Sequence, residues 1–132
     1  MSGHDPEELL ASLEATRRPG RWCMVSGVVL GADVAVAATI VEDEGLTAVI
    51  SVEDAERIGI SPTLSMAWLS LGVVSALDSV GLTAAVATAL ASEGIACNVL
   101  AGYYHDHLLV PDESASHALG VLERLGGPTR SA

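Results

Sequence analysis

The side chains best suited to chemistry gather in the second half of the chain, between residues 77 and 111. Both tyrosines, two of the four histidines and one of the two cysteines lie there, and residues 103–107 read Tyr-Tyr-His-Asp-His. Side chains alternate between the two faces of a strand, so His105 and His107 would share one face and Asp106 would take the other. Two imidazoles on one face would supply two ligands of a metal site. A neighbouring His and Asp would supply two members of a catalytic group.

Neither chemistry is complete in the sequence. No third metal ligand is identifiable beside the two histidines, and no serine lies in the Gly-x-Ser-x-Gly context of a hydrolase nucleophile. Adjacent tyrosines in a strand would present one ring to each face of the sheet, which suits an interface. We therefore expect no metal and no catalytic residue, and we assign Tyr103, Tyr104, His105 and His107 to a pocket wall or an interface.

A second candidate site lies just before this segment, where a helix begins near Gly81. The first turn of a helix presents unsatisfied backbone N–H groups and the positive end of the dipole, which attract a carboxylate without any lysine. Gly81 lets a ligand approach the backbone closely, and the Asp78 carboxylate suits an α-ammonium group. The candidate ligand-binding residues are Asp78, Val80, Gly81, Leu82, Thr83 and Asn98.

A purely structural interpretation of the same residues stays open. Asp78 or Ser79 also suits the N-cap of the helix, where its side chain would satisfy the same N–H groups. Asn98 also suits a turn, because its side chain can hydrogen-bond to the nearby backbone.

Composition narrows the classes of function. The 132 residues are 50% hydrophobic, which suits one domain or two very small ones. The net charge of −11 disfavours binding to nucleic acid. Because the chain has no lysine, it has neither the lysine of a P-loop nor one that could form a Schiff base. Cys23 and Cys97 match no metal spacing, so we expect buried reduced thiols.

The acidic N-terminus is unlike a signal peptide. The uncharged stretch 58–77 contains Pro62 and two glycines, which is unlike a membrane-spanning helix. We therefore expect a cytoplasmic protein without membrane contact, and we expect no cofactor.

Hydrophobic periodicity and turn residues predict the order of elements. The first half reads as helix, three strands and helix, and the second half as β-α-β-β-α. Ser61-Pro62 is the expected boundary, which gives an N-terminal unit over 1–61, a C-terminal unit over 62–127 and a flexible tail over 128–132. The expected helices cover residues 5–18, 52–58, 81–92 and 112–125, and the expected strands cover 21–26, 34–41, 46–50, 64–74, 95–100 and 105–110.

The second half resembles the ACT domain, a small regulatory module that binds amino acids. The resemblance rests on the Gly81-Leu82-Thr83 helix start, the Cys97-Asn98-Val99 strand start and the Tyr-Tyr-His-Asp-His segment that follows. It is closest to short stand-alone tandem ACT proteins of bacteria, which are related to the ACT domains of aspartate kinases and of the arginine sensor CASTOR. The resemblance implies an α+β fold of two ferredoxin-like βαββαβ units, with antiparallel sheets and helices on one side.

The same resemblance implies a function. ACT domains bind amino acids near the loop between the first strand and the first helix, which Asp78, Gly81, Leu82, Thr83 and Asn98 would occupy here. We expect a non-catalytic regulatory protein that binds an amino acid at an ACT interface, forms a homodimer and acts on a separate protein. The alternatives are a structural or interaction module with a vestigial pocket, and a small metal-binding protein or hydrolase built on residues 105–107.

Overall fold

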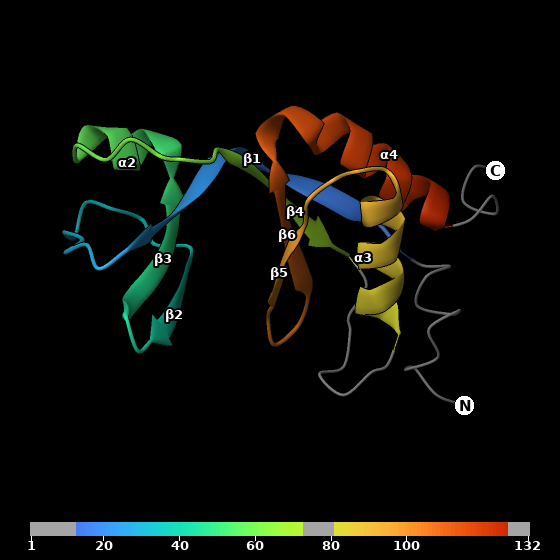
Figure 1. Cartoon of the computed structure of the whole chain (residues 1–132), viewed down its shortest axis with the longest axis horizontal. Helices are drawn as coiled ribbons and strands as arrows, with labels where there is room; N and C mark the ends of the chain where they lie inside the picture. The colour runs from blue at the N-terminus through green and yellow to red at the C-terminus, as the bar shows by residue number, and fades with distance from the viewer. Residues whose placement is uncertain (1–12, 73–80, 127–132) are drawn as a thin grey trace. The chain divides into compact units, whose positions relative to one another are not determined.

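The computed structural model describes residues 13–72 and 81–126. These form six strands, three α-helices and one 3₁₀ helix (Figure 1). The strands are β1 (Ala15–Ser26), β2 (Ala38–Glu42), β3 (Gly45–Ser51), β4 (Met66–Leu71), β5 (Asn98–Ala101) and β6 (Asp106–Pro111). The helices are α2 (Val52–Arg57), α3 (Leu82–Ser92), η1 (Asp112–Ser114) and α4 (Ala115–Leu125).

The chain divides into two compact units. The smaller unit is Pro19–Met66, and the larger unit takes in the described residues up to Arg18 together with those from Ala67 onward. The hydrogen-bonded strand order is β2-β3-β1-β4-β6-β5. β1 and β4 each contribute residues to both units. The predicted boundary at Ser61-Pro62 stays a prediction.

The larger unit has the ferredoxin-like arrangement of an ACT domain. Its elements follow one another as β4, α3, β5, β6 and α4, and the start of β1 lies beside β4 in place of a final strand. The β5–β6 pair is antiparallel, with Asn98 opposite Leu109 and Ala101 opposite Asp106. The α+β class and the βαββα order predicted for this half are therefore confirmed.

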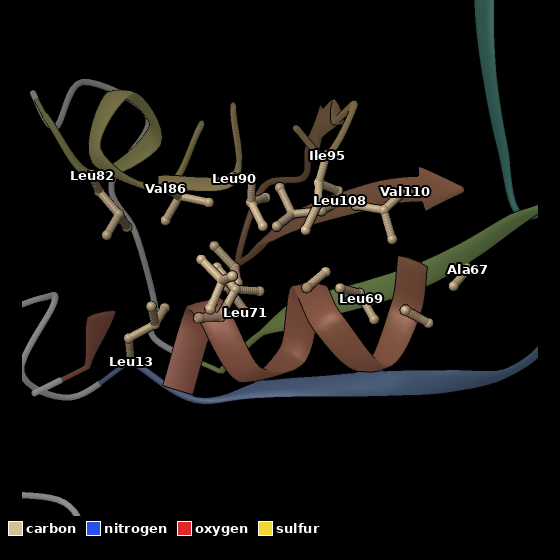
Figure 2. Packing of buried hydrophobic residues seen from close by; sticks show 14 residues of the cluster. Leu13, Ala67, Leu69, Leu71, Leu82, Val86, Leu90, Ile95, Leu108 and Val110 are labelled. Carbon is tan, nitrogen blue, oxygen red and sulfur yellow. The ribbon is translucent and has the colours of Figure 1, made fainter. Parts of the chain in front are cut away.

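The core of the larger unit lies between the sheet and the helices α3 and α4. Figure 2 shows Leu82, Val86 and Leu90 of α3 directed toward the apolar side chains of β4 and β6. Alternation along the strands sends every second residue to this face. The buried strand residues on it are Ala67, Leu69, Leu71, Leu108 and Val110.

The smaller unit is a hairpin followed by a short helix, as the sequence predicts. β3 pairs antiparallel with both β2 and β1. Ser51 caps α2, because its hydroxyl accepts a hydrogen bond from the backbone N–H of Asp54 at 3.0 Å. A separate aliphatic cluster fills this unit: Cys23, Val25, Val34, Ala48, Ile50, Val52 and Ala55. None of the helices in the described ranges is long and apolar enough to cross a membrane.

The predicted helix over residues 5–18 is wrong at its C-terminal end, and its beginning lies outside the described residues. β1 begins at Ala15 and continues through Pro19 and Gly20. Gly20 has φ of +101°, a conformation that glycine adopts without strain. Arg17 forms an ion pair with Asp112 at 2.6 Å, and Arg18 lies over the Trp68 ring, so tertiary contacts hold this segment as a strand.

Candidate functional site

The start of α3 is open at its backbone, as far as the described residues show. Gly81 is the N-cap residue with φ of +102°, and no described side chain caps the first turn. The Gly81 carbonyl accepts from the N–H of Ala85 at 2.9 Å, which closes the first helical turn. The N–H groups ahead of that turn have no partner within the helix itself, so they suit an anionic group.

The residues predicted for this site divide into three groups. Leu82 is 1% exposed and belongs to the core, so it fixes the helix start rather than offering its side chain to a ligand. Thr83 is exposed at the helix start, and Asn98 is exposed at the start of β5, in register with Leu109. Asp78 and Val80 lie outside the described residues.

Asp106 joins the candidate site at the helix start. Its side chain is only 8% exposed, and its Oδ2 lies 3.4 Å from the Thr83 hydroxyl, which donates to it. Asp106 begins β6 and shares the helix-covered face with Leu108 and Val110, as strand alternation requires. The Thr83–Asp106 contact therefore places a carboxylate beside the first turn of α3.

Sequence reasoning did not place Asp106 beside the start of α3. The prediction grouped Asp106 with the neighbouring histidines and left the α-ammonium group to Asp78. The signal was present in the spacing, because Asp106 lies at i−2 and i−4 from the apolar Leu108 and Val110.

The opposite face of the same strands carries a hydrogen-bonded cluster around His107. Trp68 Nε1 donates to Ser70 Oγ at 3.1 Å and to His107 Nδ1 at 3.3 Å. Ser70 Oγ lies 2.9 Å from the same Nδ1 atom. The Trp68 and His107 rings are 5.4 Å apart, and the Arg18 guanidinium lies 4.8 Å from the Trp68 ring centroid. Trp68, Ser70 and Arg18 were not among the predicted site residues.

The tyrosine pair does not divide between the faces of the sheet, so that expectation is wrong. Tyr103 and Tyr104 lie in the turn between β5 and β6, where the alternation of a strand does not apply. Their rings contact each other edge to face with centroids 5.0 Å apart. Both side chains are exposed, by 76% and 67%. His105 also precedes β6, so it does not share a strand face with His107.

An open groove of about 600 Å³ lies elsewhere in the larger unit, between the start of β1 and α4. None of the residues predicted for a site lines it. Its lining combines two carboxylates and two hydroxyls with small and apolar side chains: Leu13, Glu14, Ala15, Thr16, Ser116, Leu119, Gly120 and Glu123.

The described residues contain no grouping of three or more His, Cys, Asp or Glu side chains arranged to hold a metal ion. Cys23 and Cys97 are free thiols; Cys23 is buried and Cys97 is half-buried. Burial raises the pKa of both thiols, and Glu56 adds to the rise for the pKa of Cys23. A raised pKa keeps a thiol protonated and poorly nucleophilic at neutral pH.

Comparisons with known proteins agree with the fold and the order of its elements. Family models described as ACT domains match residues 4–67 and 64–124. A Vibrio cholerae protein described as of unknown function and a possible transport protein is 39% identical, with a TM-score of 0.81, over 96% of this chain and 100% of its own. The chain belongs to the ACT-domain family. Its two consecutive matches make it a tandem ACT protein.

Solved structures of lower sequence identity share the fold. The regulatory subunit of aspartate kinase from Thermus thermophilus is 14% identical, with a TM-score of 0.60 over 84% of this chain and 95% of its own. The aspartate kinase of Clostridium acetobutylicum is 10% identical, with a TM-score of 0.62 over 87% of this chain and 34% of its own. None of the curated proteins matches this sequence.

Proposed function

We propose that this ACT protein is a non-catalytic regulator that binds a free amino acid at the start of α3. The observation that carries the proposal is the Thr83–Asp106 contact, which brings a buried carboxylate to a helix N-terminus whose first turn no described side chain caps. Membership of the ACT family supports the same role, because ACT domains are usually regulatory modules that bind amino acids.

The chemistry of the two groups matches the two ends of an α-amino acid. Backbone N–H groups at a helix start donate hydrogen bonds to the α-carboxylate, so lysine, which this chain lacks, is not needed. Asp106 accepts the α-ammonium group, and Thr83 orients the Asp106 carboxylate. Gly81 keeps the approach to the backbone free of a side chain. Asn98 is opposite Leu109 whereas Asp106 is opposite Ala101, so Asn98 lies three residues away along β5, on the other face of the sheet, and does not line this pocket. Asp78 and Val80 lie outside the described residues and stay predicted ligand-binding residues.

Regulation requires that binding changes an equilibrium between two states of the protein or its assembly. A ligand shifts such an equilibrium only by its difference in affinity for the two states. We propose that a homodimer supplies the second state and that the output is a separate regulated protein. Cytoplasmic location remains a prediction from the sequence.

A thermal-shift screen of the purified protein against the twenty amino acids tests the proposal. A ligand at one hundred times its Kd stabilises the folded state by about 2.7 kcal/mol, which gives a readily measured rise in Tm. We expect one amino acid, or one chemical group of them, to raise Tm clearly more in the wild type than in Asp106→Asn. If none of the twenty raises Tm at millimolar concentration, the pocket is vestigial and the proposal fails.

A further inference from the structure

β2 is an edge strand of the sheet, and its outer side has no strand beside it in the described part of the chain (Figure 1). The strand order places β3 on one side of β2 and ends there on the other. Every residue of the smaller unit, Pro19–Met66, is described, and the side chains from Thr39 to Glu42 are exposed. An exposed edge strand is a template for pairing with a strand of another chain.

Two backbone hydrogen bonds show which residues of β3 face β2. The N–H of Gly27, just after β1, donates to the carbonyl of Leu46 at 3.0 Å, whereas the N–H of Ala37, just before β2, donates to the carbonyl of Val49 at 2.9 Å. Backbone groups along an antiparallel strand point alternately to its two sides. The even-numbered residues of β3 therefore bond to β1, and the odd-numbered residues bond to β2.

The register of β2 on β3 then identifies the backbone groups at the free edge. Odd-numbered residues of β3 lie opposite even-numbered residues of β2, as Thr47 lies opposite Ile40. The even-numbered residues of β2 therefore direct their backbone groups toward β3. Thr39 and Val41 lie between them and direct their N–H and C=O groups outward.

The sequence of β2 leaves this edge open to pairing. The strand reads Ala-Thr-Ile-Val-Glu, without proline and without a charge before Glu42, whereas edge strands are commonly protected by both. Ile40 and Val41 are 47% and 87% exposed. The other edge strand, β5, has only four residues, and its Val99 and Leu100 are half-buried. β2 therefore offers the longer and more exposed edge.

A second copy of the chain fits this edge in an antiparallel register. With a two-fold axis at Ile40, Thr39 of each copy lies opposite Val41 of the other, and each such pair exchanges both of its N–H···O=C bonds. The two Ile40 side chains then face each other in a non-hydrogen-bonded pair, where side chains of neighbouring strands lie closest. The same outward groups serve both copies, so the pairing closes as a dimer.

The charges at the end of β2 favour the antiparallel register. Glu42, Asp43 and Glu44 lie together at the hairpin turn. Antiparallel pairing places Glu42 beside Ala38 of the other copy and keeps the two turns apart, whereas parallel pairing would place like charges side by side. Each copy carries a net charge of −11, so salt should screen the repulsion between copies and strengthen the dimer. A basic strand of another protein would show the opposite dependence on salt.

We propose that the β2 strands of two copies pair antiparallel around Ile40 and join the two sheets into one. This interface belongs to the homodimer of the proposed function, and it rests on that function only for its regulatory role. The Thr83–Asp106 contact lies in the larger unit and β2 lies in the smaller one, so different variants test the two proposals.

Sedimentation velocity and amide hydrogen exchange of the full chain test the interface without any ligand. We expect dimers to accumulate as the protein concentration rises to about 1 mM, which detects a Kd of that order. The dimer fraction should be larger in concentrated than in dilute sodium chloride. Exchange of the Thr39 and Val41 amides should slow as dimers form, whereas exchange of the Ile40 amide, already directed at β3, should change little. A chain that stays monomeric, or a dimer that salt weakens, would overturn the proposal.

Two pairs of variants locate the interface. Val41→Pro removes an outward N–H without removing a bond to β3 and should abolish the dimer, whereas Val41→Ala keeps that N–H and should keep the dimer. Ile40→Lys places like charges opposite each other and should raise the dimer Kd at least about tenfold. Val29→Lys makes the same charge change at a position that is 96% exposed and outside the strands, and it should leave the Kd unchanged. Ile40→Lys decides the question if Val41→Pro does not fold, and an unchanged Kd in Ile40→Lys would overturn the proposal.

Discussion

The hydroxyl of Thr83 donates to the buried carboxylate of Asp106, and this contact joins the first turn of α3 to the first residue of β6. The two residues are 23 positions apart in the sequence. Thr83 and Asp106 come into contact because α3 packs on the face of the sheet that Asp106 shares with Leu108 and Val110. The hydrophobic core thereby assembles the polar pair on which the proposed function rests.

Two glycine-to-alanine substitutions should have opposite effects on stability. Gly81 has φ of +102°, so Gly81→Ala forces an L-residue into the left-handed region and should lower the free energy of unfolding by about 1–2 kcal/mol. Gly120 lies inside α4, and a Cβ there would meet only Arg124 at an ordinary 3.5 Å. Gly120→Ala should therefore stabilise the protein by about 0.5–1 kcal/mol.

Urea unfolding of the wild type and both glycine variants measures these changes. Gly81→Ala should also weaken ligand-dependent stabilisation if the helix start is the binding site, whereas Gly120→Ala should preserve it. Equal effects of the two substitutions on unfolding would show that the backbone at Gly81 is not as described.

Shortening a buried aliphatic side chain to alanine should lower the free energy of unfolding far more than the same change at an exposed position. Leu69 of β4 is fully buried between the sheet and the helices, so Leu69→Ala should cost about 2–5 kcal/mol through lost burial and a residual cavity. Val41 of β2 is 87% exposed, and Val41→Ala should change the free energy of unfolding by less than about 0.5 kcal/mol. Chemical denaturation monitored by circular dichroism distinguishes the two; a Leu69→Ala variant as stable as Val41→Ala would contradict the packing.

His107 should make stability depend on pH in a defined direction. Its folded-state pKa lies below the ordinary value of 6.5, with burial as the main cause. A group with a lowered cationic pKa stabilises the fold fully above its unfolded pKa, and this contribution is lost as pH falls from about 6.5 toward the folded pKa. Urea unfolding at pH 7.5 and 5.5 should show a larger loss of stability for the wild type than for His107→Gln. An identical loss in both proteins would show that His107 does not contribute to the pH dependence of stability.

Several helices and strands could be predicted because the sequence features that specify them lie within a few residues of each other. Ser51 before an acidic turn marked the start of α2, and Gly81 and Gly94 bracketed α3 with positive φ values. The apolar run Leu108-Leu109-Val110, which ends at Pro111, indicated β6. These features act over a few residues, so sequence spacing alone carries them.

The parts that sequence reasoning missed depend on distant contacts. Arg17 and Arg18 are typical of the last turn of a helix, yet Asp112 and Trp68, far along the chain, hold them in β1. The contacts of His107 with Trp68 and Ser70 likewise require β4 to lie beside β6, which no local pattern in the sequence specifies.

Isothermal titration calorimetry with the amino acid that most raises Tm measures whether Asp106 contributes to its binding. We expect the wild type to bind it, and Asp106→Asn, which keeps the size of the side chain but removes its charge, to bind at least about tenfold more weakly, as the loss of a charge-assisted hydrogen bond predicts. Thr83→Ser should retain binding, because its hydroxyl still reaches Asp106. Undiminished affinity in a folded Asp106→Asn variant would contradict the account.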